Sequence, residues 1–190
     1  MKEMLFHGSE VADIQVLKAC SRLHNTNEKV VYLSGNLPYA LLYIWDSVKH
    51  ECGRKHVTAG LKNGIIVYEE QFPNQLEVLY KGAKGYVYCV EKTEDMGTVD
   101  DHENMYYSLT DVSVCDCIYI KDVYEEMMKY EKEGKFKVLR FLEAEKAKQE
   151  EWTKRIAEVI LQRGFLHEDT DKARFYKKYF KDSWELAELR

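Results

Sequence analysis

The distribution of turn-forming and charged residues divides this chain near position 120 and constrains its fold more than any other feature. Both prolines and eight of the ten glycines lie before that point. Residues 1–120 carry 11 basic and 17 acidic side chains (23% charged), whereas residues 121–190 carry 17 basic and 16 acidic side chains (47% charged). Glycine and proline mark strands and turns, whereas dense charge with few breakers is typical of solvent-facing helices. The pattern predicts an α+β domain over residues 1–123 and a helical extension over residues 124–190.

Short runs rich in β-branched and aromatic residues predict the strands of the first part. They cover residues 30–33, 64–68, 86–90, 105–109 and 114–120. Proline suits the first turn of a helix, so Pro38 predicts a helix over residues 39–48. The second part is expected to form helices over residues 121–133, over 138–163 and from residue 171, with glycines after the first two.

The composition limits the partners and the location of the protein. With 45% hydrophobic residues the chain can bury a core, and a net charge of −5 argues against general binding to nucleic acid. The longest apolar run has nine residues, far short of the roughly 20 that a membrane helix needs. The amino terminus resembles no export signal, and none of the five cysteines forms a CxxC pair, so we expect a cytoplasmic protein with reduced thiols.

Three further clusters have simple structural explanations. His50 and His56 flank Cys52, but a second ligand pair at zinc spacing is absent from the sequence, so no metal site is expected. Cys115 and Cys117 share one face of an expected strand and are interpreted as small buried fillers. Aromatic residues interleaved with lysines follow residue 171, and they are typical of a helix that packs its aromatic face on the core.

The residues with most chemical content lie in the first 43 positions. A predicted strand ends in His7-Gly8-Ser9, the next carries Tyr32 and Ser34, and Tyr43 follows Tyr32 by eleven residues. Glycine lets a ligand approach the backbone, and an imidazole nitrogen can bind a sugar hydroxyl. Two tyrosines at a suitable distance can stack on a flat ring. These residues predict a nucleotide site, although burial of both tyrosines in the core is an equally simple interpretation.

This pattern resembles the ADP-ribosyltransferase superfamily, in the branch of diphtheria toxin and the poly(ADP-ribose) polymerases. The chain also looks like small bacterial members of that superfamily that have no assigned role. The resemblance implies a split β-sandwich fold and NAD as substrate. It further implies that Gly8 and Ser9 hold the nicotinamide carboxamide, that His7 holds a ribose hydroxyl, and that Tyr32 and Tyr43 stack on the nicotinamide. Ser34 matches the strand that carries Tyr32.

The family also places a glutamate at the start of a late strand. The matching strand here covers residues 105–109, and Glu103 is the glutamate next to it. A gapless comparison instead puts Asn104 in that position. A carboxylate there would stabilise the positive charge that develops on the ribose as nicotinamide leaves. Glu103 is therefore the expected catalytic carboxylate, with His7 and Tyr32 as its partners, and Asn104 in its place would remove that charge.

Three functions follow as expectations. The first is an NAD-binding ADP-ribosyltransferase-like protein that transfers ADP-ribose to an unknown acceptor. The second is a catalytically degenerate domain that binds a nucleotide or a protein, which Asn104 would favour. The third is an interaction protein that assembles, for example as a homodimer, through its carboxy-terminal helices.

Overall fold

Strand β1 (Met4–Ser9) lies inside a seven-stranded sheet in a computed structural model of the chain, which describes residues 3–44, 58–99, 102 and 104–190. The order of the main path is β11-β7-β1-β4-β9-β8, and β3 pairs with β4 beside it. The other strands of this sheet are β3 (Ser21–Arg22), β4 (Lys29–Ser34), β7 (Gly85–Glu91), β8 (Gly97–Thr98), β9 (Met105–Ser108) and β11 (Asp116–Ile120). All pairings in this sheet are antiparallel.

Two smaller sheets complete the β structure. One contains β2 (Val16–Leu17) and β10 (Val112–Ser113), which pair antiparallel. The other has the order β12-β6-β5 and consists of β5 (Thr58–Lys62), β6 (Ile65–Glu69) and β12 (Phe136–Leu139). Strand β12 runs parallel to β6, with Phe136 opposite Ile66. The fold is therefore mixed α+β with mainly antiparallel sheets.

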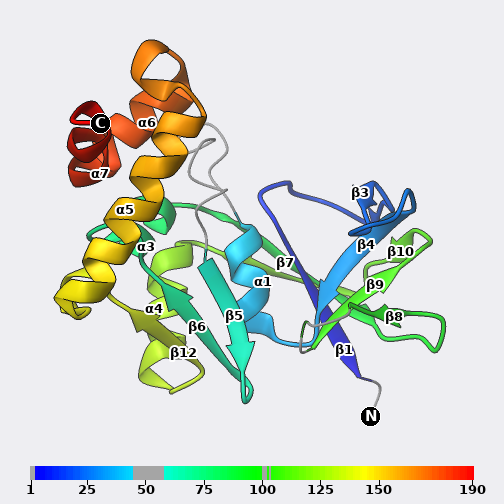
Figure 1. Cartoon of the computed structure of the whole chain (residues 1–190). Helices are drawn as coiled ribbons and strands as arrows, with labels where there is room; N and C mark the ends of the chain where they lie inside the picture. Colours follow the sequence, from blue (N-terminus) through cyan, green and yellow to red (C-terminus); the bar gives the residue numbers. More distant parts are fainter. Residues whose placement is uncertain (1–2, 45–57, 100–101, 103) are drawn as a thin grey trace.

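Helices and short helical turns complete the described fold. They are α1 (Leu37–Ala40), η1 (Leu41–Tyr43), α3 (Gln75–Tyr80), α4 (Val123–Lys132), η3 (Phe141–Glu143), α5 (Lys146–Gln162), η4 (Phe165–His167), α6 (Asp171–Tyr179) and α7 (Lys181–Glu188). Figure 1 shows α1 between the β5–β6 hairpin and the strands β1 and β4, with α5, α6 and α7 on the opposite side of the molecule from β8 and β9. Helix α1 thus stands next to the strand that ends in His7-Gly8-Ser9.

The structure corrects three expectations about the elements. The helix expected over residues 39–48 begins near Pro38, but its backbone becomes extended at Ile44, and residues 45–48 lie outside the described part. The helix expected over residues 138–163 is wrong at its start, because β12 and η3 precede α5. The last helix is interrupted at Phe180, whose backbone leaves the helical region.

The second part of the chain is consequently more than a helical extension. Residues 124–190 contain β12, which pairs with β6 of the first part. The main hydrophobic core also draws on both parts, since Leu76 and Val87 share it with Met127, Phe136 and other side chains up to Ala187. The aromatic residues Tyr176, Phe180 and Trp184 are all buried in this core, which confirms their interpretation as packing residues.

The two cysteines expected to be buried fillers are exposed. Cys115 precedes β11 and Cys117 lies in it, and β11 is the end strand of the main sheet among the described residues. Cys89 on the neighbouring strand is the buried thiol, and desolvation raises its pKa to about 11. Sequence alone does not tell an edge strand from a central one, and for this reason the predicted burial of Cys115 and Cys117 is wrong.

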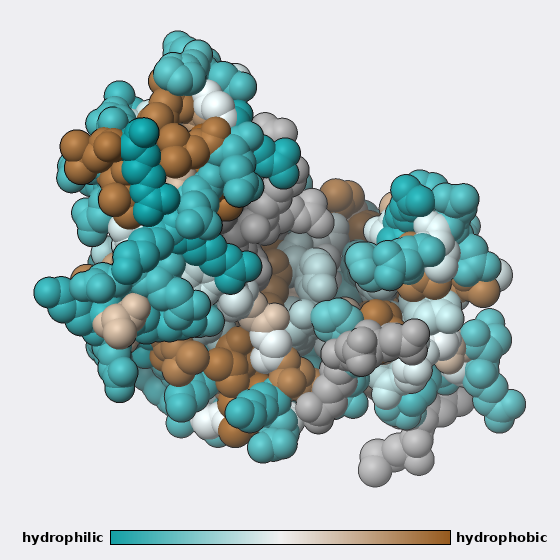
Figure 2. Space-filling view, viewed as in Figure 1, coloured by the Kyte–Doolittle hydropathy of each residue, from teal (hydrophilic) through white to brown (hydrophobic). Residues whose placement is uncertain are grey.

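Figure 2 shows that charged and polar residues cover much of this face of the molecule and that apolar residues gather over α6 and α7. Leu189, directly after α7, is one of the most exposed large apolar side chains. Within residues 3–44, 58–99, 102 and 104–190, no helix is both long and apolar enough to cross a membrane.

Candidate functional site

The three strands named by the sequence motifs are neighbours in the main sheet. Strand β4 pairs with β1 on one side and with β9 on the other. Strand β1 pairs with β7 at every position from Met4 to Ser9, but with β4 only through Phe6 and Ser34. The two strands that carry His7 and Tyr32 therefore diverge beyond Phe6 and leave an opening between them.

His7 bridges this opening. Its Nδ1 lies 2.9 Å from the backbone carbonyl oxygen of Tyr32. A carbonyl can only accept, so Nδ1 carries the proton and donates. Burial lowers the pKa of His7 below 6.5, and the hydrogen bond to Tyr32 opposes that shift. The neutral ring with a proton on Nδ1 leaves Nε2 as a hydrogen-bond acceptor.

Gly8 is required by a close approach of helix to strand. A Cβ atom added at Gly8 would overlap the backbone carbonyl oxygen of Ala40 in α1 and press on Ile44. The glycine thus sets the spacing between β1 and the turn that carries Tyr43. The neighbouring Ser9 accepts a hydrogen bond from the Val11 amide through Oγ at 3.1 Å, which turns the chain away from the strand.

Tyr32 is held by its hydroxyl group. The hydroxyl donates to the carbonyl of Arg22 at 3.1 Å and accepts from the amide of His24 at 3.2 Å. The β3 segment is thereby tied to the ring of Tyr32. Ser34, at the end of the same strand, is buried, donates to the Asn36 carbonyl and accepts from the Asn36 amide, both at 3.0 Å. Ser34 therefore shapes the turn into α1.

Two tyrosines follow on α1 and η1. The Asn36 side chain accepts from the Tyr39 amide and caps α1, which fixes the start of this turn. The rings of Tyr39 and Tyr43 lie 5.9 Å apart at an angle of 56°. Tyr43 is 42% exposed, so its burial in the core, one of the two interpretations of the sequence, does not occur.

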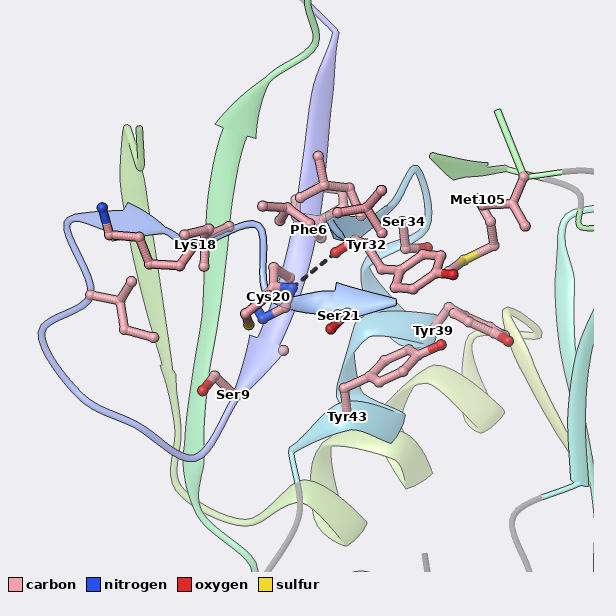
Figure 3. Close-up of a pocket in the computed structure, with 18 of the residues that line it drawn as sticks. Phe6, Ser9, Lys18, Cys20, Ser21, Tyr32, Ser34, Tyr39, Tyr43 and Met105 are labelled. Carbon is pink, nitrogen blue, oxygen red and sulfur yellow. Dashed lines mark hydrogen bonds between the residues drawn. The ribbon is translucent and has the colours of Figure 1, made fainter. Parts of the chain in front are cut away.

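These residues line one cavity of about 880 Å³. The six described residues that sequence motifs select all line it: His7, Gly8, Ser9, Tyr32, Ser34 and Tyr43. Its size falls in the range of small-molecule sites. Figure 3 shows the tyrosines and Met105 at one end of the cavity, Lys18 at the other, and Cys20 and Ser21 between them.

The expected catalytic carboxylate, Glu103, lies outside the described residues. Asn104 directly precedes β9 with a left-handed backbone (φ 56°), and it is not part of the cavity wall, whereas His102 and Met105 are. Among the described lining residues, Glu10 is the one carboxylate. Glu10 directly follows Ser9.

Several lining residues escaped sequence reasoning. Tyr39 is the clearest case, since its spacing of four residues from Tyr43 after a helix-starting proline was a usable signal. Lys18, Cys20 and Ser21 come from the segment between β1 and β4, which forms one wall of the cavity. That segment has no regular pattern, so nothing in the sequence marked it as part of the site.

The wall from residue 10 to residue 24 is fastened by polar side chains of neighbouring strands and loops. The Tyr88 hydroxyl donates to the Val11 carbonyl at 2.6 Å and accepts from the Ile14 amide at 3.3 Å. Asp111 forms an ion pair with Lys18 at 2.7 Å and accepts from the Ala19 amide. The cavity therefore has a preformed outer wall.

No group of three or more histidine, cysteine, aspartate or glutamate side chains in the described part of the chain is arranged to hold a metal ion. His50, Cys52 and His56 lie outside the described residues.

Comparisons of the chain with protein-family models, with curated proteins and with solved structures found no match. The function of this chain has to be inferred from the cavity and the residues that line it.

Proposed function

We propose that the cavity binds NAD and that the protein is an ADP-ribosyltransferase-like protein that transfers ADP-ribose to an acceptor. One observation carries the proposal. The six described residues that resemble the NAD-binding motifs of that superfamily come from β1, β4 and the α1–η1 turn, and all of them line one cavity.

The geometry suits each proposed contact. His7 is neutral with its proton on Nδ1, so Nε2 accepts a hydrogen bond from a ribose hydroxyl. Tyr32 is half-buried and held by its hydroxyl, so its ring can stack without further loss of side-chain freedom. Tyr43 exposes its ring and supplies a second aromatic surface. Gly8 and Ser9 lie beside them at the end of β1 and contact the carboxamide.

The proposed reaction breaks the bond between the anomeric carbon of the ribose and the nicotinamide nitrogen. Nicotinamide leaves with the electron pair of that bond. The acceptor nucleophile then forms a bond to the anomeric carbon and loses its proton. A carboxylate near that carbon stabilises the positive charge in the transition state. Glu103 is the proposed carboxylate, and Glu10 is a second one within the described wall of the cavity.

A second candidate function is binding of a nucleotide without transfer. It is favoured by the position of Asn104, the residue that a gapless comparison puts in the place of the glutamate. Asn104 is exposed and outside the cavity wall. In that case the cavity would recognise NAD or a related nucleotide as a signal and leave it intact.

Calorimetric titration of the full chain with NAD tests binding. We expect measurable heat at millimolar NAD or below, and His7→Ala should weaken affinity about tenfold or more through loss of a half-buried hydrogen-bonding group. His167→Ala is the matched control, because His167 is exposed on η4. Absence of binding by the native chain at millimolar NAD would overturn the proposal.

Release of nicotinamide separates transfer from simple binding. The native chain, Glu103→Gln and Glu10→Gln are compared at saturating NAD. Loss of release in Glu103→Gln with unchanged binding supports Glu103 as the carboxylate, and loss in Glu10→Gln alone supports Glu10. Binding without any release identifies the second function.

A further inference from the structure

Three tyrosine rings surround one end of the cavity. Tyr32 comes from β4, Tyr39 from α1 and Tyr43 from η1, and all three line the cavity wall. Figure 3 shows their rings close together at this end, with Met105 beyond Tyr32. The tilt of 56° between Tyr39 and Tyr43 makes two walls of a corner, and Figure 3 shows the ring of Tyr32 beside that corner. The sequence motifs identify Tyr32 and Tyr43 as site residues, and the structure adds Tyr39 to them.

Two of the three rings, those of Tyr32 and Tyr39, are held in place before any ligand binds. The Tyr32 hydroxyl has two hydrogen-bond partners in the segment from Arg22 to His24. Tyr39 packs partly against the main core and its amide is capped by Asn36. A preformed aromatic wall loses little conformational freedom on binding, so more of its attraction appears as affinity.

The charge distribution leaves this end open to a cation. Lys18 is the only lysine or arginine among the described residues of the cavity wall, and it lies at the other end of the cavity, paired with Asp111 at 2.7 Å. The faces of aromatic rings carry negative potential and attract cations within about 6 Å. A ring that carries a positive charge therefore gains an attraction here that a neutral ring of the same shape does not.

We propose that the Tyr32–Tyr39–Tyr43 corner selects a positively charged aromatic ring, and that Tyr39 is a specificity-determining residue. The inference rests on the proposed function, and it deepens that function by naming the charge state of the ring. The oxidised dinucleotide, whose nicotinamide ring is a cation, is bound in preference to forms with a neutral ring. Small pyridinium compounds compete for the same corner.

The test compares two ligands that differ in charge and share one shape. 1-Methylnicotinamide is a cation, and 3-methylbenzamide replaces its ring nitrogen by carbon. Both are titrated into the full chain at pH 8, above the ordinary titration range of histidine. We expect the cation to bind about threefold to thirtyfold more tightly, which is the range of cation–π attractions at half-buried sites.

Variants assign the preference to Tyr39. Tyr39→Leu keeps an apolar side chain but removes a ring face, so the affinity ratio of the two ligands should fall while the affinity for 3-methylbenzamide changes little. Tyr39→Phe keeps the ring face and should keep the ratio. Tyr119→Leu is the matched control, since Tyr119 is 55% exposed on β11, outside the cavity wall.

The outcomes separate this inference from the proposed function. NAD binding together with a ratio near one, or a ratio that Tyr39→Leu leaves unchanged, overturns the inference and leaves NAD binding intact. Failure of NAD and of both small ligands to bind overturns both. A ratio above threefold that falls in Tyr39→Leu and persists in Tyr39→Phe supports the inference.

Discussion

The side chain of His7 donates from Nδ1 to the backbone carbonyl of Tyr32 at 2.9 Å, across the opening where β1 and β4 separate. One hydrogen bond thus sets the tautomer of the histidine and links the two strands that carry the proposed site. Burial of the same ring lowers its pKa and so links the protonation of His7 to the stability of the fold.

The free energy of unfolding should fall in mild acid because of His7. Burial lowers the folded-state pKa below 6.5, so between pH 6.5 and that lower pKa the unfolded chain binds more protons. The stabilising contribution of the neutral ring is therefore complete above pH 6.5 and is lost as the pH falls through the folded pKa. His7→Asn keeps a donor near the Nδ1 position and does not titrate. Urea unfolding from pH 5 to pH 8 should show a steeper loss in the native chain than in His7→Asn, and parallel curves would contradict this account.

Gly8→Ala should destabilise the fold by about 3 kcal/mol or more, because the added methyl group overlaps the Ala40 carbonyl and α1 has to move. Gly60→Ala is the matched control: it lies in β5, and a Cβ there meets nothing within 4 Å. We expect Gly60→Ala to change the free energy of unfolding by less than about 1 kcal/mol. Urea denaturation of both variants measures the difference, and equal effects would refute the close approach.

The hydroxyl groups of Tyr32 and Tyr88 should fasten separate parts of the cavity wall. Tyr32→Phe releases the Arg22–His24 segment, and Tyr88→Phe releases the Val11–Ile14 segment. Each variant should lose about 1–2 kcal/mol of stability. Amide hydrogen exchange should accelerate near residue 24 in the first variant and near residue 14 in the second. Tyr119→Phe serves as control, since the Tyr119 hydroxyl has no hydrogen-bond partner within the described residues. Faster exchange near residue 24 or residue 14 in this control variant would contradict the assignment.

A fragment of residues 1–123 should not fold cooperatively. It lacks β12, so β6 loses its parallel partner, and it lacks the fully buried Met127 and Phe136. The remaining core residues would be exposed to water, and each Å² of exposed apolar area costs about 25 cal/mol of folding free energy. Circular dichroism during urea titration should show no sharp transition for the fragment and one transition for the full chain. A cooperative transition in the fragment would mean that the first part is an independent domain.

The sequence was informative where local pattern decides structure. Tyr86 and Val90 belong to a central strand that its β-branched and aromatic residues predict clearly. Asp122 caps α4 at the point where charged residues become frequent in the sequence. Phe136 and Val138 alternate with exposed neighbours in the manner of a strand, yet the helix expected over residues 138–163 includes the last two residues of this strand. Its partner β6 lies far away along the chain, and local pattern carries no information about such a pairing.

For the site, the sequence selected residues on regular elements and missed Tyr39 on α1 together with several residues on an irregular segment. His7 and Tyr32 could be found because each lies on a strand with a recognisable motif. Lys18 and Cys20 lie in a segment whose course depends on Tyr88 and Asp111, residues distant in the sequence. Such long-range fastening is a tertiary property, and it decides which side chains of an irregular segment reach the cavity.

The parallel pairing of β12 with β6 also has a consequence for the order of events during synthesis. Strand β6 leaves the ribosome long before Phe136 exists, so until then one of its edges has no strand beside it. The core that supports α1 and the proposed site is completed only with residues as late as Ala187. Ligand-binding competence is therefore expected to arise only after α7 has been synthesised, and premature termination anywhere before α7 should yield a chain that exposes apolar surface to the quality-control machinery.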